Sequence, residues 1–200
     1  LNSLVTCIFA MIICITCACL AGYGVTRFQF KGKKQLMDFL LVTQMFPSVM
    51  LVVPFYAVLS KYHMTNKLIG LIIVYAATNV AFSTWMLVSY FKTVPIELDE
   101  AARVDGAGEM QCFFYITLPN LKSSLYTITV LSFLNSFKVF REAYLVAGDY
   151  PHESIYMMQH LFNNWFRAFS FDKMAAAAVL ESLVLLALIM LLQKAWDSKA

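Results

Sequence analysis

The stretch PIELDEAARVDGAGEMQCFFYITLPNLK, residues 95–122, lies between two long apolar runs and decides how the chain is organised. Of the chain's twelve acidic residues, the stretch contains Glu97, Asp99, Glu100, Asp105 and Glu109. Its only basic residue before Lys122 is Arg103. Because the flanking runs are apolar enough to lie in a bilayer, we expect this polar stretch to form a loop at one face of a membrane.

The first half of the stretch has the features of a short helix. Pro95 suits the first turn of a helix, where its missing N–H costs nothing, and the acidic residues that follow favour the positive end of the helix. On this helix Arg103 can pair with Asp99, four residues before it, or with Glu100, three residues before it. Gly106 fits the left-handed position that ends many helices.

A second short helix is expected after Gly106. Ala107, Met110 and Phe114 recur along one face of it, and Pro119 closes it. Two short helices that are joined at a glycine and project from a membrane domain would form a docking surface.

The same residues carry a resemblance to a known family. Glu100-Ala101-Ala102, three residues, Gly106, nine residues and then Ile116-Thr117-Leu118-Pro119 resembles the EAA signature of ABC-importer inner-membrane permeases. The resemblance extends from Asn2 to about Leu192 and is nearest to the sugar-type, maltose-permease-like members. It implies an all-α, polytopic helical bundle, the type I importer permease core, in which this loop is a coupling-helix loop.

The resemblance also implies partners and site residues. In the family, the loop, residues 95–120 here, inserts into a groove on a cytoplasmic ABC ATPase dimer and passes its movement to the membrane helices. Further expected partners are a second permease subunit in a heterodimer and an extracytoplasmic solute-binding protein. The residues expected to couple to the ATPase are Glu100, Ala101, Ala102, Asp105, Gly106, Leu118 and Pro119.

The composition indicates an integral membrane protein. Of 200 residues, 60% are hydrophobic and 14% are charged, and the mean hydropathy is +0.69, whereas soluble domains are nearer half apolar and a quarter charged. The net charge of +3 is too small to indicate a nucleic-acid partner. Four of the five cysteines lie in the first apolar run, where we interpret them as small buried hydrophobes and not as a metal or redox site.

Five apolar segments are long enough to span a bilayer, which takes about 20 residues. These expected spans, in one transmembrane domain covering residues 1–200, are residues 4–25, 36–59, 68–90, 121–145 and 174–192. Pro47 and Pro54 predict kinks in the second span, and broken helices in transporters often line the solute pathway. Since the chain opens without an initiator Met or a signal peptide, we expect the sequence to lack its beginning.

The basic residues between the spans predict the orientation. Nine of them follow spans 1, 3 and 5: Arg27, Lys31, Lys33, Lys34, Lys92, Arg103, Lys122, Lys194 and Lys199. The four on the other side are Lys61, Lys67, Arg167 and Lys173. By the positive-inside rule the first set is cytoplasmic, so the N-terminus of this chain lies outside the cytoplasmic membrane and the C-terminus inside.

The loop from Arg27 to Lys33 is aromatic and basic, and resembles the linker common in sugar-type permeases. Two interpretations stay open: a basic collar at lipid head groups, or a conformational role.

Polar residues within the expected spans suggest a solute path. They are Gln44, Asn79, Ser83, Ser132, Asn135 and Ser136. Because polar groups in a bilayer need a partner or water, we expect this set to line a path for a hydroxylated solute. The alternative is plain hydrogen bonding between helices.

Two further patterns lie towards the outer face. Lys138, Arg141 and Glu142 suit a salt-bridged outer helix end, and a functional role for them stays open. The stretch Phe137-Lys138-Val139-Phe140 resembles the partner permease of the heterodimer, which leaves open which of the two subunits this is. Residues 148–172 repeat apolar side chains at helical spacing, which predicts an amphipathic helix at the outer interface or a contact for the solute-binding protein.

The leading functional prediction is a permease subunit of an ATP-driven sugar or oligosaccharide importer. The chain has no phosphate-binding G-x-x-x-x-G-K-[ST] loop, so ATP would be hydrolysed by a separate subunit. Its three histidines lie outside the expected spans, and the spans hold a single deep acidic residue, so we expect no enzyme activity, cofactor or metal. Alternatives are a permease for amino acids, peptides or polyols, an ATP-independent transporter and a membrane-embedded enzyme.

Overall fold

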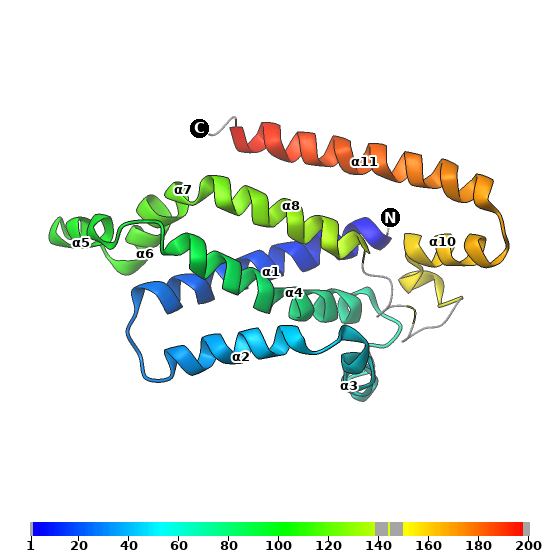
Figure 1. The fold of residues 1–200 in the computed structure, drawn as a ribbon, viewed down its shortest axis with the longest axis horizontal. Helices are drawn as coiled ribbons and strands as arrows, with labels where there is room; N and C mark the ends of the chain where they lie inside the picture. The colour runs from blue at the N-terminus through cyan, green and yellow to red at the C-terminus, as the bar shows by residue number, and fades with distance from the viewer. Residues whose placement is uncertain (1, 139–143, 145–149, 198–200) are drawn as a thin grey trace.

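The computed structural model describes residues 2–138, 144 and 150–197, and the regular elements within them are all helical (Figure 1). The all-α fold class predicted from the sequence is thereby confirmed for this part of the chain. The longer helices are α1 (Asn2–Arg27), α2 (Lys33–Met45), α3 (Ser48–Lys61), α4 (Leu68–Phe91), α8 (Lys122–Lys138), α10 (Met158–Arg167) and α11 (Phe171–Asp197). The short ones are α5 (Ile96–Val104), α6 (Glu109–Gln111), η1 (Cys112–Thr117), α7 (Leu118–Asn120) and η2 (Glu153–Ile155).

The centre of the bundle is the pair α1 and α4, with α8 packed against both. Small residues make the close approach of α1 and α4 feasible, since Ala10, Cys14, Ala18 and Gly22 recur every four residues along α1 and are all buried. A Cβ atom at Gly22 would lie 2.9 Å from Cε2 of Phe91 on α4. The interpretation of the cysteines as small packing residues agrees with this, although Cys17 is exposed.

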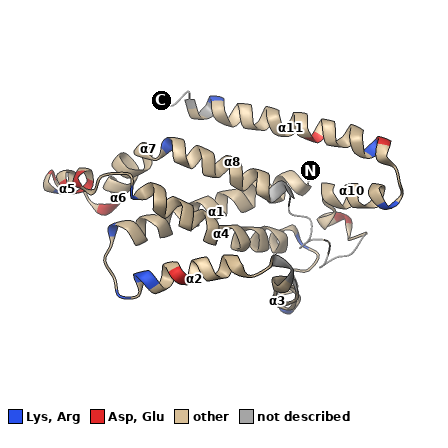
Figure 2. Cartoon of the chain, viewed as in Figure 1, with Lys and Arg blue, Asp and Glu red and all other residues tan. Residues whose placement is uncertain are grey.

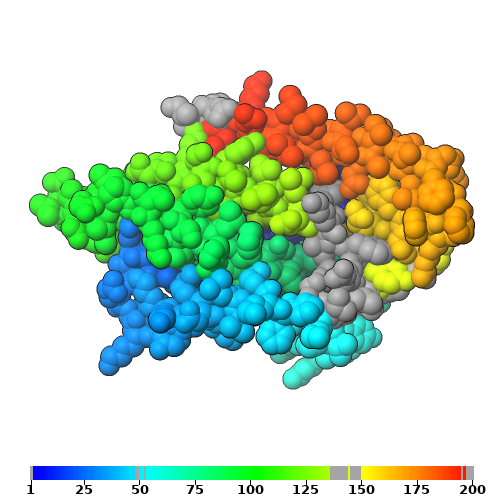
Figure 3. Space-filling view, viewed as in Figure 1, coloured from blue at the N-terminus to red at the C-terminus, as the bar shows by residue number. Residues whose placement is uncertain are grey.

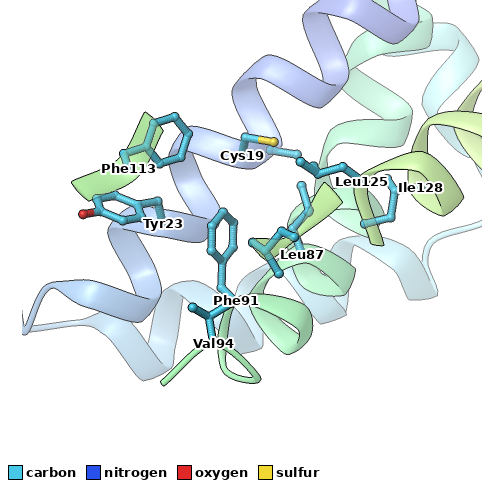
Figure 4. Packing of buried hydrophobic residues seen from close by; sticks show 10 residues of the cluster. Cys19, Tyr23, Leu87, Phe91, Val94, Phe113, Leu125 and Ile128 are labelled. Atoms are coloured by element: carbon cyan, nitrogen blue, oxygen red, sulfur yellow. The ribbon is translucent and has the colours of Figure 1, made fainter. Parts of the chain in front are cut away.

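The largest apolar cluster lies at one end of this pair, where four elements meet (Figure 4). Tyr23 of α1 packs edge-on against Phe113 of η1, with ring centroids 4.9 Å apart, and against Phe91 of α4, at 6.2 Å. Leu125 and Ile128 of α8 close the cluster from the other side. A second cluster, near the opposite end, joins α1 and α4 to η2 through Ile155 and Met157.

The expected second span, residues 36–59, is two helices in the structure. α2 ends at Met45 and α3 begins at Ser48, because Phe46 and Pro47 take extended backbone conformations. Proline restrains the residue before it to this conformation and cannot donate a helical hydrogen bond. Pro54, by contrast, lies inside α3.

Three helices within the described residues are long and apolar enough to cross a membrane: α1, α4 and α11. The 26 residues of α1 extend about 39 Å, against a hydrocarbon core of about 30 Å. α2 and α3 are too short to span singly, and α8 is described only to Lys138. The count of five spans therefore stays a prediction.

Charged residues gather at the two ends of the bundle, and the middle of α1, α4 and α8 is free of them (Figure 2). α11 lies along the outside, with Leu180, Leu183 and Leu191 more than half exposed (Figure 3). A long helix whose exposed side is apolar suits contact with lipid or with another membrane helix.

Candidate docking surface

The structure places α5 and α6 beyond one end of the bundle, where they project from it (Figures 1 and 3). α5 forms as the sequence predicts: Pro95 precedes its first residue, and Glu97 and Asp99 lie in its first turn, with Arg103 in its last. Gly106 has φ = +91°, so the turn after α5 uses the left-handed conformation expected of it.

The ion pairs of this region differ from those expected. Arg103 pairs with neither Asp99 nor Glu100; it donates from Nε and Nη2 to the two carboxylate oxygens of Glu109, each at 2.9 Å. The pair therefore bridges the glycine turn from α5 to α6. Asp99 and Arg103 share a face of α5, but the carboxylate of Asp99 is buried against Arg27 and Thr117, and Arg103 extends to Glu109 instead.

The Arg103–Glu109 pair is at the surface, with side-chain exposures of 34% and 46%. The hydrogen bond from Arg103 lowers the pKa of the Glu109 carboxyl below its usual value. The hydrogen bond to Glu109 in turn raises the pKa of Arg103. Both groups are therefore charged at neutral pH, but solvent screening limits such a pair to about 1 kcal/mol or less.

A second ion pair lies beneath α5 and is buried. Arg27 Nε, at the end of α1, lies 2.6 Å from Oδ2 of Asp99, and the two side chains are 4% and 0% exposed. The two atoms are in contact without the alignment of a hydrogen bond. Arg27 also donates from Nη2 to the carbonyl of Val94 at 3.1 Å, and Thr117 Oγ1 donates to Oδ1 of Asp99 at 3.0 Å.

This buried pair was not found from the sequence. In the sequence, Arg27 is a basic residue at the edge of an expected span, and Asp99 is one of several acidic residues in the loop. The two residues are 72 positions apart, and this separation hides the contact from a local interpretation of the sequence. Removing one partner of a buried ion pair typically costs about 3–5 kcal/mol.

The second helix expected after Gly106 is three consecutive helical segments in the structure. α6, η1 and α7 follow one another from Glu109 to Asn120, so the helical run ends one residue after Pro119. The π-helical turn η1 shifts the hydrogen-bond register just before the proline, which lacks an N–H to continue it. Met110 and Phe114, expected on one face, are 65% and 53% exposed.

Of the residues expected to couple to an ATPase, five lie in α5 or the turn after it, and the other two, Leu118 and Pro119, lie in α7. Glu100, Ala101, Asp105, Gly106 and Pro119 are exposed, and Ala102 and Leu118 are half-buried. Asp105 and Gly106 line one side of a hollow of about 330 Å³, and Gln111 and Tyr115 line the other. Two large side chains of this region are strongly exposed: Tyr115 of the hollow, at 80%, and Val104, at 87%, which precedes Asp105 in the chain. Exposed apolar residues beside acidic ones are features of a protein-binding surface.

The residues expected along a solute path differ in burial and in their hydrogen-bond partners. Ser83 of α4 and Ser132 of α8 are buried with their Oγ atoms 3.5 Å apart, which is a contact of the kind that interhelical hydrogen bonding predicts. Asn79 is half-buried and donates to the carbonyl of Tyr75, at 2.8 Å, in its own helix. Gln44 and Asn135 are exposed, and the side chain of Ser136 lies outside what the structure describes.

The remaining predictions concern the other end of the bundle. A helix does occur in residues 148–172, but α10 covers only Met158–Arg167, and Ile155 is buried in η2 before it. The side chain of Lys138, and Arg141 and Glu142 entirely, lie outside the described residues. The cluster expected from these three charges stays a prediction.

Comparison with known proteins gives the family. A profile described as "Binding-protein-dependent transport system inner membrane component" matches residues 8–200. The maltodextrin transport system permease protein MdxG of Bacillus subtilis is 35% identical over 68% of this chain and 49% of its own length. The trehalose/maltose transport system permease protein MalG of Thermococcus litoralis is 30% identical over 96% of this chain and 69% of its own. The maltodextrin permease protein MalD of Streptococcus pneumoniae is 27% identical over 97% and 69%.

The chain thus spans from about half to about two thirds of the length of these curated relatives. The profile match covers nearly all of the chain, and the long apolar helices agree with the membrane location that its description gives. The resemblance noted from the sequence is therefore confirmed. The chain is a multi-pass protein of the cytoplasmic membrane and belongs to the family of binding-protein-dependent transport system inner membrane components.

Proposed function

We propose that the chain is the permease subunit of an ATP-binding-cassette importer that moves a sugar or oligosaccharide across the cytoplasmic membrane. The observation that carries this proposal is the projecting α5–Gly106–α6 surface. It exposes both acidic and apolar side chains, and the buried Arg27–Asp99 pair attaches it to the bundle. The names of the relatives, which transport maltodextrin or trehalose and maltose, support a sugar as the solute.

The projecting surface is proposed to bind a cytoplasmic ABC ATPase dimer, which hydrolyses the ATP that drives transport. Glu100, Asp105 and Gly106 would lie against the ATPase, and the half-buried Ala102 would lie where close approach excludes a larger side chain. The α5 end of the bundle then faces the cytoplasm, with the N-terminus of this chain outside and its C-terminus inside. The end of the bundle that carries α10 would meet an extracytoplasmic solute-binding protein.

A second permease subunit is the proposed neighbour within the membrane. α11 offers a surface for it, because its apolar side chains are largely unburied within this chain. A solute path would form between the two subunits, and the polar residues at positions 44, 79, 83, 132, 135 and 136 are the proposed contribution of this chain. Lipid would cover the rest.

The test is reconstitution of the full-length protein with its partner permease, the ATPase and the solute-binding protein in proteoliposomes. We expect uptake of labelled maltodextrin or trehalose that requires ATP and the binding protein together. Parallel samples with labelled amino acid, dipeptide and polyol separate a sugar importer from other importers of the same type. Uptake that proceeds equally without ATP would contradict the proposal and indicate an ATP-independent transporter.

A further inference from the structure

Most of α5 is exposed to solvent, so its one buried residue shows where the helix contacts the rest of the protein. Among the nine residues of α5, only Asp99 is buried, and it is a charged residue. The rest of the helix is exposed or half-buried, including every position proposed to meet the ATPase. A displacement of α5 can therefore reach the bundle through the two ends of the helix, through the contacts of Asp99, and through the exposed Arg103–Glu109 pair, which Tyr23 of α1 contacts.

The Arg27–Asp99 pair joins α5 to three other segments at one place. Arg27 belongs to the last turn of α1, and it also holds the carbonyl of Val94, in the turn that connects α4 to α5. Thr117 belongs to η1 and donates to the other oxygen of Asp99, at 3.0 Å. Because these groups are removed from water, their attraction is weakly screened and depends steeply on distance.

α1 is also held at its opposite end. Asn2 Nδ2 donates to the carbonyl of Glu153 at 2.8 Å, and the backbone N–H of Met158 donates to Oγ of Ser3 at 2.9 Å. α1 thus runs as one uninterrupted helix from the buried ion pair under α5 to the segment 153–158 at the other end of the bundle (Figure 1).

We infer that Arg27 and Asp99 are positioning residues that tie α5 to α1, so that movement of the docking helix is passed along α1 to the segment 153–158. This inference deepens the proposed function, on which it rests. A packed helix suits such a role because it shifts as a rigid body more readily than it stretches. The alternative is that the ion pair only supports the shape of the loop.

The decisive comparison is Asp99→Asn against Glu109→Gln. Each variant replaces one carboxylate of the same loop by an amide of the same size, and each breaks one ion pair with an arginine. The Asp99 pair is buried and joins α5 directly to α1, whereas the Glu109 pair is exposed and joins α5 to α6. Glu109 also accepts hydrogen bonds from the hydroxyl of Tyr23 of α1, at 3.4 Å to its carboxylate and to its carbonyl, and Glu109→Gln keeps an oxygen at both places. We expect Asp99→Asn to lower solute uptake per ATP hydrolysed by at least about fivefold, within the range of about 5- to 150-fold that coupling between sites spans. Glu109→Gln should leave this ratio near that of the wild type.

A spin label at residue 153 reports movement at the far end of α1. If the Arg27–Asp99 pair only supported the shape of the loop, its loss would not change the response of this label to ATP. Glu153 is exposed in η2, and Cys17→Ala removes the one exposed cysteine of the described chain, so that Glu153→Cys can be labelled selectively. In the assembled importer we expect ATP to change the spectrum of the label with wild-type Asp99 and with Glu109→Gln. The change should be lost or much reduced with Asp99→Asn.

Two results would overturn the inference. One is an Asp99→Asn importer with a normal spectral change and a normal ratio of uptake to hydrolysis. The other is a loss of ATPase recovery that matches the loss of uptake while the ratio is unchanged, because the pair would then be a support only. If Asp99→Asn fails to fold, Thr117→Val, which keeps both charges, must lower the ratio in the same direction, and an unchanged ratio refutes the inference. Failure of the wild-type chain to recover any ATPase would instead refute the proposed function.

Discussion

Gly106→Val tests whether the turn between α5 and α6 shapes the docking surface. The backbone there has φ = +91°, a conformation that β-branched residues adopt poorly. Space is not the obstacle, since a Cβ atom at Gly106 would have no neighbour within 4 Å. Gly108 is a matched control two residues away: its φ is −76° and its nearest neighbour would lie 3.8 Å from the new Cβ. Gly108→Val is therefore unstrained.

The magnitude follows from the strain. A non-glycine residue held in this region costs about 1–3 kcal/mol. The turn can relieve that strain by a shift of α6 relative to α5, while Arg27 and Thr117 still hold Asp99 of α5. Across the turn, this shift is opposed by the exposed Arg103–Glu109 pair, which contributes about 1 kcal/mol or less. The loop of the free permease should then leave its docking conformation, which the ATPase must restore on binding. At about 1.4 kcal/mol per factor of ten, the Kd for the ATPase rises about 5- to 150-fold.

The assay is titration of the ATPase onto equal amounts of each permease variant in lipid nanodiscs. We expect Gly106→Val to bind weakly and to support little uptake, and Gly108→Val to resemble the wild type in both. Thermal melting of each permease without the ATPase checks that the membrane core is intact, because Gly106 lies outside it. Equal affinities for the two variants, with normal uptake by Gly106→Val, would mean that this turn does not shape the docking surface.

Four further outcomes are expected. Glu100→Ala should weaken ATPase binding less than Gly106→Val does, because it removes one exposed carboxylate without bending the loop; an unchanged Kd would place Glu100 outside the contact. Gly22→Ala should lower the Tm of the permease, since its Cβ would lie 2.9 Å from the buried ring of Phe91 and overpacking costs about 1–3 kcal/mol, whereas Gly24→Ala, with nothing within 4 Å, should raise it through helix propensity. The chain purified alone should not hydrolyse ATP, and turnover in a coupled phosphate-release assay would contradict the proposed division of labour. Single cysteines on the proposed path should react with a small water-soluble thiol reagent in at least one of the ATP-bound and nucleotide-free states. The positions to be replaced are Asn79, Ser83, Ser132, Asn135 and Ser136. Protection of all five in both states would indicate plain helix packing.

The local features of the docking loop could be predicted because each depends on neighbours in the sequence. Pro95, the acidic first turn and Gly106 fix where α5 begins and ends, and the structure has them in those places. The break at Pro47 is local in the same sense. What the local pattern left open was which partner each charged side chain of α5 takes. Asp99 and Arg103 could pair within the helix, but α1 and η1 supply Arg27 and Thr117 to Asp99, and α6 supplies Glu109 to Arg103.

Two arginines of similar appearance in the sequence therefore end in opposite environments. Arg103 remains at the surface, where water screens its pair with Glu109 and the contact contributes little. Arg27 is taken into the interior between α1, α5 and the turn after α4, where an unpaired charge would be costly. A buried charge pair is a poor way to stabilise a loop, because apolar residues of similar size would often do so equally well. Its advantage is specificity: Arg27 and Asp99 satisfy each other in one relative position of α1 and α5, which is the property that a connection between a moving docking helix and a membrane helix requires.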